Sequence, residues 1–328
     1  MGEFQVYLSR SLDPAHNLAI EEYLMETLPK DHKILYLWQN KNSIIIGRNQ
    51  NPYKECRLKI MEKENVRLIR RLSGGGAVYH DIGNLNFTFI ASAENYSIDD
   101  NFEVIFSALK KFNITGEFNG RNDLTVNEKK FSGNAFVTEN GMHCHHGTLL
   151  VNVDIDKLIK YLSVSKLKVE SKGIDSIKSR VINLQDCAKN LDVESLKSEL
   201  IKSFSEKYNV QNSHVIISEG LFKLDKYMNK YNSWEWNYSE SPEFEITLER
   251  KYSWGIIDIL LNVENGTIAM LNIHTDSIIQ DNFSQLAINL KGQPLKLTNI
   301  LTTIKSTLNT PILIDDISLI FEEYLTSQ

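Results

Sequence analysis

The sequence predicts an α+β protein with a large domain over residues 1–242 and a small domain over residues 243–328. Short strand-like runs alternate irregularly with capped helical patterns through the first part of the chain, which favours a mixed architecture. Around residues 233–243 the composition changes, and two tryptophans and a Ser-Pro pair indicate a domain boundary. The length of 328 residues suits one large domain and one smaller domain.

Hydrophobic residues make up 42% of the chain and charged residues 24%, which are ordinary values for a soluble globular protein. We expect neither a signal peptide nor a membrane span, because no basic start precedes an apolar segment and no apolar run approaches about 20 residues. The three cysteines, Cys56, Cys144 and Cys187, are scattered and form no Cys-x-x-Cys pair, which predicts a reducing cytoplasm. The net charge of −6 argues against nucleic acid and against an anionic membrane as partners.

The first elements are expected to be a strand over residues 4–8 and a helix that starts at Asp13-Pro14. Asp13 is a good N-cap, and Pro14 at the first helical position loses no hydrogen bond. Glu22 falls on the apolar stripe of this helix, where a carboxylate needs a partner. Two interpretations stay open. Glu22 either reaches water at the edge of the stripe or pairs with an arginine of the glycine-rich loop described below.

Residues 34–38 and 43–47 are predicted to be two short strands separated by a polar turn, and residues 53–65 are predicted to be helical. Residues 85–90 alternate between apolar and polar side chains, which predicts a half-buried strand. A helix over residues 101–113 is expected next, because its apolar residues recur at helical spacing.

The rest of the chain is expected to be organised around Arg70–Asp81, with the sequence Arg-Arg-Leu-Ser-Gly-Gly-Gly-Ala-Val-Tyr-His-Asp. A strand-like run over 66–69 leads into it, and a second run containing His80 follows. Three glycines between two strands cost conformational entropy, so their backbone is expected to approach something closely. Bare amides beside arginines suit a carboxylate or a phosphate, although a flexible hairpin loop is the plainer alternative. The spacing fits neither a Walker loop nor a dinucleotide fingerprint, and no Gly-x-Ser-x-Gly nucleophile elbow is present.

A second chemical stretch, Gly120–Ala135, is predicted to form a β-hairpin that turns at residues 127–128. Lys129 and Lys130 point to opposite faces of the return strand, so one can face solvent while the other faces a site. A fully solvated hairpin is the alternative. Asp123 is a candidate oxygen ligand for a divalent cation, since Mg²⁺ takes one or two carboxylates together with water and phosphate.

The run His143–Thr148 gathers three histidines and a cysteine, which are residue types that bind metals. Successive side chains of an extended segment alternate between faces, so four neighbours cannot converge on one ion. We therefore interpret the run as the start of a strand that continues over residues 149–153 and lies beside the site.

Residues 166–180 hold five basic and two acidic side chains without strong periodicity. They form either a solvated loop or a mobile basic loop that closes over an anion. A capped helix is expected over residues 191–208. Beyond the boundary we expect three strands, the last two joined at Asn265-Gly266, and then a helical tail.

Taken in order, these motifs resemble those of the bacterial lipoate–protein ligases of the two-domain type. The similar segments are Arg70–Asp81, Gly120–Leu124 with Lys130–Ala135, His145–Leu150, Lys172–Ile174 with Ser179–Leu184, and Ser233–Asn237. The likeness runs nearly from end to end. It implies a fold shared with biotin ligases and related to class II synthetase cores. That fold is a mixed β-sheet with helices on one side, followed by a small α+β C-terminal domain.

The resemblance also implies a two-step reaction. Lipoate and ATP, with Mg²⁺, give lipoyl-adenylate and pyrophosphate, and the lysine amine of an acyl-carrier domain then takes the lipoyl group and releases AMP. Glycine cleavage H protein and the E2 subunits of 2-oxoacid dehydrogenases are the implied carriers. Lipoate and octanoate are not distinguished, since both offer an apolar chain and a carboxylate.

Carried over by position, Lys130 is implied to be the catalytic residue, whose ammonium would stabilise charge in both transition states. The residues implied to bind substrate or adenylate are Arg70, Ser73, Gly74, Gly75, Gly76, Ala77, Tyr79, His80, Asn122, Ser132, Gly133, Ala135, His146, Gly147, Lys172 and Arg180. Asn84 and Asp123 are the implied candidates for the Mg²⁺ and phosphate side, and the loop over residues 166–183 is implied to close over the adenylate.

Two other functions stay open. An ATP-independent lipoyl or octanoyl transferase would share the pocket, and the related transferases use a cysteine where this chain has Asn122-Asp123. The nearby thiol is Cys144, whose pKa His145 could lower, but we do not expect it to be a nucleophile. A non-catalytic carrier-binding paralogue is the other possibility, and the presence of Lys130 and Asp123 argues against it.

Overall fold

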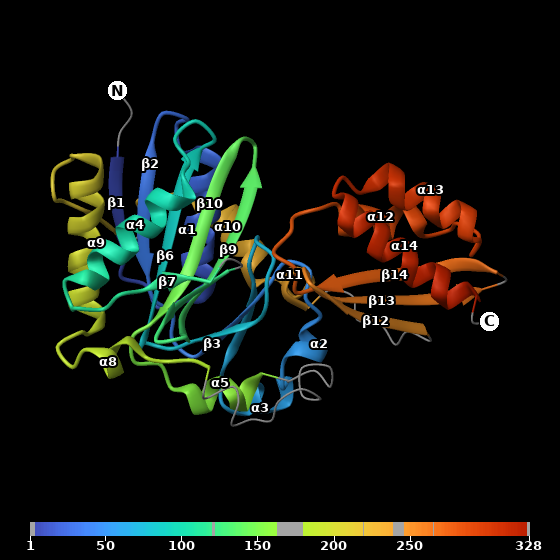
Figure 1. The fold of residues 1–328 in the computed structure, drawn as a ribbon, viewed down its shortest axis with the longest axis horizontal. Coiled ribbons are helices and arrows are strands. Elements are labelled where there is room, and N and C mark those ends of the chain that lie inside the picture. The colour runs from blue at the N-terminus through green and yellow to red at the C-terminus, as the bar shows by residue number, and fades with distance from the viewer. Residues whose placement is uncertain are drawn as a thin grey trace.

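The computed structural model describes residues 4–119, 122–162, 180–218, 220–238, 246–264 and 266–326. A large sheet with its helices fills the left of Figure 1, and a smaller sheet with helices above it lies to the right. The predicted α+β class is confirmed.

The large sheet has eight strands in the described part of the chain, in the order β11-β1-β2-β6-β10-β9-β8-β7. β1 runs parallel to both of its neighbours, and the other pairs are antiparallel, so the sheet is mixed as expected. The bounds are Phe4–Ser9 for β1, Lys33–Trp38 for β2, Asn84–Ser92 for β6, Glu117–Phe118 for β7, Asp123–Val126 for β8, Lys129–Glu139 for β9, Met142–Leu150 for β10 and Val215–Ile217 for β11.

Helices cover both faces of this sheet, which corrects the expectation of helices on one side. α1 (Pro14–Thr27) and α10 (Asp225–Asn232) share a hydrophobic core with alternate residues of β2. α4 (Ile98–Lys110) and α9 (Val193–Tyr208) share a second core with the residues between them. Successive side chains of a strand point to opposite faces, so both faces of β2 are buried.

The same double coverage explains why β6 is not the half-buried strand that its alternation predicted. All nine residues of β6 are buried, including polar Asn86 and Thr88. β6 lies in the middle of the sheet, between β2 and β10. A central strand of a covered sheet buries both faces whatever its pattern, so its polar side chains need buried partners.

Both predicted helix starts are confirmed. The Asp13 carboxylate accepts hydrogen bonds from the backbone amides of Ala15 and His16, and Pro14 occupies the first helical position. Asp192 caps α9 in a reciprocal capping box. These contacts satisfy amides that the start of a helix leaves without an intrahelical partner.

A second, three-stranded sheet carries the glycine-rich loop. Its order is β4 (Arg67–Arg70), β3 (Ser43–Ile46) and β5 (Val78–His80), and residues 71–77 connect β4 to β5. The loop therefore lies between two strands as predicted. β2 and β3 are both strands as expected, but they belong to different sheets. Further short helices are α2 (Pro52–Glu55), α3 (Leu58–Lys63), α5 (Ile155–Tyr161), α8 (Leu184–Cys187) and α11 (Trp234–Tyr238).

The C-terminal unit is an antiparallel sheet with helices and has a hydrophobic core of its own. Its described elements are β12 (Ile246–Tyr252), β13 (Gly255–Glu264), β14 (Thr267–Thr275), α12 (Phe283–Leu290), α13 (Leu297–Thr307) and α14 (Pro311–Thr326). The β13–β14 hairpin and the helical tail agree with the sequence, and a domain division at 242/243 stays a prediction. Among the described helices, none combines the length and the apolar character that crossing a membrane requires.

Candidate active site

A cavity of about 120 Å³ lies on the face of the large sheet that carries α1. Trp38 of β2, Asn86 of β6 and Thr148 of β10 sit opposite one another across three strands and belong to its wall. The lining residues are Leu18, Trp38, Ile45, Arg71, Gly75, Gly76, Ala77, Val78, His80, Asn86, Asn122, Lys130, Gly133, Asn134, Ala135, His146, Gly147 and Thr148.

Lys130 on β9 brings an ammonium group to this wall. Its Nζ lies 2.6 Å from Oδ1 of Asp123 on β8, and the two side chains are 34% and 26% exposed. A substrate anion would therefore compete with Asp123 for Lys130. The Lys130 backbone pairs with the end of the predicted adenylate loop. Its N–H donates to the Arg180 carbonyl at 2.7 Å, and its carbonyl accepts from the Ile182 N–H at 2.9 Å.

Gly133 gives the Lys130 side chain room to reach the cavity. A Cβ atom at position 133 would lie 3.2 Å from Lys130 Nζ and 3.3 Å from its Cε, which is tighter than ordinary contact. Gly147 on the neighbouring strand is similarly constrained, since a Cβ there would lie 2.6 Å from the ring of Phe87. The packing of this wall therefore leaves little room for a side chain at either position.

Arg71 holds the glycine-rich loop from inside the protein. Its guanidinium donates to the carbonyl oxygens of Ile45 at 3.2 Å, Gly74 at 2.6 Å and Gly76 at 2.9 Å. Burial lowers the pKa of Arg71 to about 10, so the group stays charged at neutral pH. The loop is thus shaped by a buried cation that grips its carbonyl groups.

The loop does not present all of its amides bare, as the sequence suggested. The Gly75 N–H donates to the carbonyl of Ser277, in the segment after β14, at 2.9 Å. Gly75 has a φ of 89°, a left-handed backbone that glycine adopts easily. A Cβ at Gly74 would lie 2.4 Å from the same carbonyl oxygen. The C-terminal unit therefore covers part of the loop with its backbone.

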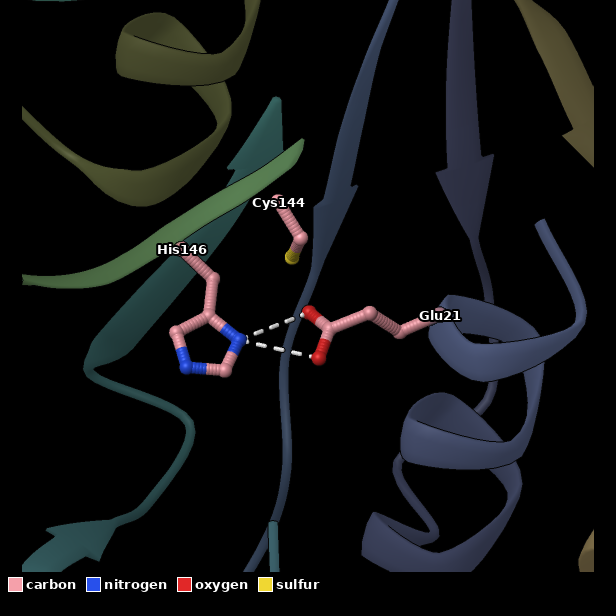
Figure 2. A group of neighbouring side chains, drawn as sticks. All are labelled: Glu21, Cys144 and His146. Carbon is pink, nitrogen blue, oxygen red and sulfur yellow. Dashed lines mark hydrogen bonds and ion pairs between the residues drawn. The ribbon is translucent and has the colours of Figure 1, made fainter. Parts of the chain in front are cut away.

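A chain of buried side chains runs from α1 through β10 to the loop. Nδ1 of His146 lies 2.9 and 3.0 Å from the two carboxylate oxygens of Glu21 (Figure 2), and its Nε2 lies 2.6 Å from Oγ of Ser73. Thr88 donates to Glu21 at 2.6 Å, and Arg71 Nε donates to Ser73 Oγ at 3.1 Å. Because a carboxylate only accepts, Nδ1 of His146 carries a proton.

Figure 2 also places Cys144 beside Glu21 and His146, and one ligand-type atom from each lies within 4.8 Å of the others. Both ring nitrogens of His146 are engaged in the chain above. Burial raises the pKa of the Cys144 thiol well above its usual value, and the Glu21 carboxylate adds to the effect. A protonated thiol suits neither a metal ligand nor a nucleophile. His145 does not lower this pKa as considered from the sequence, because it points to the other face and stacks on Phe136.

Glu21, rather than Glu22, is the carboxylate that serves this region. Glu22 is also buried, but its carboxylate accepts from Lys230 Nζ on α10 at 2.8 and 2.9 Å. It therefore neither reaches water nor pairs with Arg70 or Arg71, which corrects both interpretations. Consecutive helix positions differ by about 100° around the axis, so positions 21 and 22 face different partners.

Many of the residues implied to bind substrate come together in the cavity wall, although their role as ligands stays a prediction. Those that line it are Gly75, Gly76, Ala77, His80, Asn122, Lys130, Gly133, Ala135, His146 and Gly147. They come from four separate segments of the chain, so the fold brings the quoted motifs to one place.

Arg70 is not among the residues that line the cavity, and its side chain instead links separate segments of the backbone. Its guanidinium donates to backbone carbonyl oxygens of Gly47, Arg48, Gln50, Trp236 and Asn237, at 2.7–3.2 Å. These bonds tie β4 to the segment after β3 and to α11. The arginine that lines the cavity is the next residue along the chain.

Tyr79 and Ser73 lie behind the wall. Tyr79 packs against Tyr161 in a separate core, because it alternates with its cavity-lining neighbours on β5. Ser73 is fully buried, and its hydroxyl is engaged with His146. Neither side chain is placed to contact a ligand in this cavity.

The other residues implied to bind substrate also fall outside the wall. Gly74 lies beneath Ser277, Ser132 is buried, and the Arg180 side chain is exposed beside the backbone of β9. Lys172 lies outside the described residues, as does most of the basic loop predicted over residues 166–183.

Asn84 and Asp123 lie on separate strands, and their role on the Mg²⁺ and phosphate side stays a prediction. Asn84 lies on β6 and Asp123 on β8, with β10 and β9 between them. Three strand spacings of about 4.8 Å give a separation of roughly 14 Å, whereas Mg²⁺ binds oxygen at about 2.1 Å. Asp123 is also paired with Lys130, and Asn84 Nδ2 donates to Asn86. The strand order that separates the two residues is not visible in the sequence.

Several wall residues were not singled out from the sequence as ligands, namely Leu18, Trp38, Ile45, Val78, Asn86, Asn134 and Thr148. Asn134 and Thr148 stand inside the quoted motifs, so the motifs themselves pointed to them. Trp38 and Asn86 become neighbours only through the pairing of β2 with β6. Glu21 could have been suspected from two consecutive carboxylates on an apolar helix.

Comparisons with known proteins identify the family to which the chain is similar. The family model for the lipoyl protein ligase A/B catalytic domain matches residues 13–205, and the model for the bacterial lipoate protein ligase C-terminus matches residues 241–319. A curated relative from Blochmanniella floridana, named lipoate-protein ligase A, is 38% identical over 300 residues, which covers 89% of each chain.

Solved structures point the same way. LipL1 of P. falciparum in complex with lipoate has a TM-score of 0.86 at 31% identity, covering 99% of this chain and 100% of that one. A bipartite lipoate protein ligase of Thermoplasma acidophilum, described with its E2 lipoyl domain, has a TM-score of 0.64 at 27% identity, covering 75% and 100%. A lipoate-protein ligase A bound with ATP has a TM-score of 0.61 at 28% identity, covering 72% and 98%.

The first family model alone spans more than half of the chain, and the second follows it in chain order. The motifs that the models cover are those that build the cavity wall around Lys130 and the glycine-rich loop. The chain therefore belongs to the lipoate–protein ligase family, as an enzyme of the ligase class with both matched domains.

Proposed function

We propose that this enzyme activates lipoate with ATP to form lipoyl-adenylate and then transfers the lipoyl group to a lysine of an acyl-carrier domain. The observation that carries the proposal is the Lys130 ammonium in a cavity whose wall also holds apolar Leu18, Ile45 and Val78. A carboxylate at the end of an apolar chain matches both features.

The relatives support the choice of substrates. One solved relative is in complex with lipoate, one is bound with ATP, and one is described with its E2 lipoyl domain. We extend these ligands to this chain and propose E2 lipoyl domains and glycine cleavage H protein as carriers. The described cysteines are free, which suits the cytoplasm as the proposed location.

In the first step, a carboxylate oxygen of lipoate attacks the α-phosphorus of ATP. A new O–P bond forms, and pyrophosphate leaves with the electron pair of the broken P–O bond. Lys130 would hold the carboxylate and then the bridging oxygen, because a fixed ammonium stabilises the negative charge that builds there. Binding of the substrate would replace Asp123 as the partner of Lys130. Mg²⁺ would accompany the ATP, and Asn84 and Asp123 are the proposed residues on the Mg²⁺ and phosphate side.

In the second step, the ε-amine of the carrier lysine attacks the acyl carbonyl carbon. A C–N bond forms, the C–O bond to AMP breaks, and the amine loses a proton. AMP leaves with the bonding electron pair. Lys130 would stabilise the oxygen atoms that gain charge in this step as well, which is why one residue serves both transition states.

Cysteine chemistry argues for the adenylate route over a thioester route. Burial raises the pKa of Cys56 to about 12 and that of Cys144 well above its usual value. The pKa of Cys187 is raised as well, by partial burial and by Asp186. Because the thiolate is the nucleophile, none of these thiols is primed to carry an acyl group.

The test combines purified protein, lipoate, ATP with a magnesium salt, and an apo E2 lipoyl domain. AMP is measured by chromatography and the carrier by mass spectrometry. We expect AMP release and a carrier that gains one lipoyl group, both dependent on ATP. Parallel reactions with octanoate and with apo H protein rank the acyl and carrier substrates.

Two other results would replace the proposal. Modification of the carrier by synthetic lipoyl-adenylate, without any reaction from lipoate and ATP, would make the protein a transferase. Failure of both reactions with retained carrier binding would make it a non-catalytic carrier-binding paralogue.

A further inference from the structure

β14 is an edge strand of the small sheet, whose strand order is β12-β13-β14 (Figure 1). Its register with β13 is regular from Leu271 to Thr275. The Thr275 N–H leaves the sheet and donates to the Asn49 carbonyl at 2.7 Å. In an antiparallel pair, every second residue of an edge strand directs its N–H and C=O groups away from the neighbouring strand. The backbone groups of Leu271 and Ile273 therefore point outward, as those of Thr275 do.

This outward edge of β14 is covered at both ends and open between them. At the start of β14, the Ile268 N–H donates to the Gln293 carbonyl at 2.9 Å, and Asn49 covers the other end. Between these ends, the outward groups of Leu271 and Ile273 have no hydrogen bond to the part of the chain that the structure describes. Unpaired groups on a strand edge are a template for a further strand.

The open part of the edge borders a groove of about 560 Å³, a volume typical of ligand sites. Leu271 and Ile273 line this groove together with Ile288 of α12. Arg48 and Trp236, which precede the C-terminal unit in the chain, line it as well. The described lining residues of the groove and those of the candidate active-site cavity have no member in common, so the groove is separate from that cavity.

The groove is positively charged. Arg48, Arg70 and Lys291 line it, against one carboxylate, that of Glu235, among its described lining residues. Burial lowers the pKa of Arg70 to about 10, so this group stays charged at neutral pH. Neither Arg48 nor Lys291 forms an ion pair within the described ranges of the chain. Because the protein does not compensate their charges, these two residues favour an acidic partner.

Arg48 is oriented to receive a carboxylate. Its Cζ atom lies 4.2 Å from the ring centroid of Trp236. The ring is itself fixed, because its Nε1–H donates to the Arg70 carbonyl at 2.7 Å. The guanidinium N–H groups of Arg48 make no hydrogen bond to the described residues. A guanidinium stacked on an aromatic ring keeps its planar fork available, and that fork matches the two oxygen atoms of a carboxylate.

We propose that this groove binds an acidic segment of a partner protein in an extended conformation. The segment adds a fourth strand beside β14 and pairs with the outward N–H and C=O groups of Leu271 and Ile273. Arg48 and Lys291 bind its carboxylates. Side chains alternate along such a strand, so one set would face α12, where Ile288 is 64% exposed and offers an apolar contact. A small anion would use the cations but leave the strand edge unpaired, so the groove selects an extended chain.

A fluorescently labelled hexapeptide of alternating glutamate and valine tests the groove by fluorescence anisotropy. We expect saturable binding that weakens as the salt concentration rises, because the carboxylates contact exposed cations. The same peptide with lysine in place of glutamate should not bind. Absence of binding by the glutamate peptide, or equal binding by the lysine peptide, would overturn the proposal. So would displacement of the peptide by free glutamate at an equal concentration, because the site would then recognise only a carboxylate.

Backbone methylation of the peptide tests the added strand directly. One peptide carries N-methyl groups on every glutamate, and a second carries them on every valine. The N–H groups of successive residues point to opposite edges of a strand, so only one of these peptides places its methyl groups against β14. We expect that peptide to bind at least about 10-fold more weakly and the other to bind like the unmodified peptide. Equal affinities of the two methylated peptides would exclude strand addition.

Two variants test the cations of the groove. Arg48→Gln removes the guanidinium, and loss of a hydrogen bond to a charged group should weaken peptide binding by roughly 10-fold. Lys291→Glu turns an attraction into a repulsion and should weaken binding by roughly 5-fold. The matched control is Lys305→Glu, at an exposed lysine on α13 outside the groove, which should bind like the wild type.

Circular dichroism establishes that each variant is folded. Folded Arg48→Gln and Lys291→Glu proteins with the wild-type dissociation constant would contradict the assigned contacts. Hydrogen exchange measured by mass spectrometry then locates the peptide, which should slow exchange over residues 270–274 as the outward amides become bonded. Unchanged exchange in this range at saturating peptide would place the binding elsewhere and refute the proposal.

A final variant separates this groove from the proposed ligase reaction. Lys130→Ala should bind the peptide like the wild type, because the groove and the cavity share no described lining residue. Loss of peptide binding in a folded Lys130→Ala protein would show that the two sites are not separate. Peptide binding does not require formation of lipoyl-adenylate, so failure of either one leaves the other standing.

Discussion

Oγ of Ser73 lies 2.6 Å from Nε2 of His146, and this contact ties the glycine-rich loop to a carboxylate on α1. Ser73 is fully buried and does not belong to the cavity wall, so its hydroxyl acts on the loop rather than on a ligand. Arg71 grips the loop carbonyls from the same side. The loop is therefore held from behind by side chains, while its glycine backbone and Ala77 reach the cavity.

Replacing Lys130 tests the central residue of the proposed reaction. Lys130→Ala removes the one lysine among the described residues of the cavity wall, and loss of a fixed charge donor lowers turnover by roughly 100-fold or more. We expect AMP formation from lipoate and ATP to fall by at least that factor. Lys129→Ala, at the exposed neighbour, is the control and should react like the wild type. Normal AMP formation by Lys130→Ala would contradict the assigned role.

Gly133→Ala tests the path of the lysine without touching its charge. The new Cβ would lie 3.2 Å from Lys130 Nζ and displace it. A misplaced catalytic group costs up to about 100-fold in rate, so we expect AMP formation to fall by roughly 10- to 100-fold. The melting temperature should change little, because the obstacle is the far end of a flexible side chain. An active variant would mean that Lys130 does not need this position.

Glu21→Gln tests the buried chain behind the loop. The change removes a negative charge that raises the pKa of buried Arg71 and lies 2.9 Å from Nδ1 of His146. Removing one partner of a buried charge pair typically costs about 3 kcal/mol or more of unfolding free energy. Urea denaturation should show a loss of about that size. Glu26→Gln, on the exposed side of the same helix, breaks a surface pair with Lys226 and should cost less than about 1 kcal/mol.

Acid should destabilise the fold through two buried neutral histidines. Burial lowers the pKa of His80 to about 3 and that of His145 well below its usual value. A histidine in the unfolded chain titrates near about 6.5, so below that pH the unfolded state binds protons that the folded state refuses. Stability is therefore present above about pH 6.5 and falls as the pH drops. We expect a loss of roughly 2 kcal/mol between about pH 6 and about pH 5.

Urea unfolding at several pH values checks this expectation. His145→Gln removes one of the two titrations while keeping a donor toward Asn134, which accepts from the His145 ring at 2.8 Å. The slope of unfolding free energy against pH should therefore drop by about half in that variant. A wild-type profile that is flat across this range would show that the two rings are not held neutral.

The elements of the fold were largely predictable, because local patterns decide them. Asp13 indicated the start of α1 as its N-cap, and the glycine-rich loop was expected between two strands. The coverage of both sheet faces was not predictable in the same way. The alternation in β6 describes one strand, whereas the burial of Asn86 and Thr88 depends on helices that arrive from elsewhere in the chain.

The sequence alone did not decide which of two neighbouring residues lines the cavity. Arg70 and Arg71 are equivalent by type, and only the end of β4 decides that the second one lines the cavity. Tyr79 and His80 are consecutive residues of β5, so their side chains point to opposite faces of the strand. Asn84 and Asp123 both suit a cation by chemistry, but the strand order places them apart.

The bonds from Gly75 N–H to the Ser277 carbonyl and from Thr275 N–H to the Asn49 carbonyl are made entirely by main-chain atoms. Every residue type except proline offers the same two groups, so substitutions at Ser277, Thr275 and Asn49 leave the bonding pattern available, whereas the left-handed backbone of Gly75 favours glycine. Covariation between aligned positions arises from complementary side chains. An alignment of related sequences would therefore show little covariation between the positions that these main-chain bonds connect. The two units can diverge in sequence while remaining joined in space.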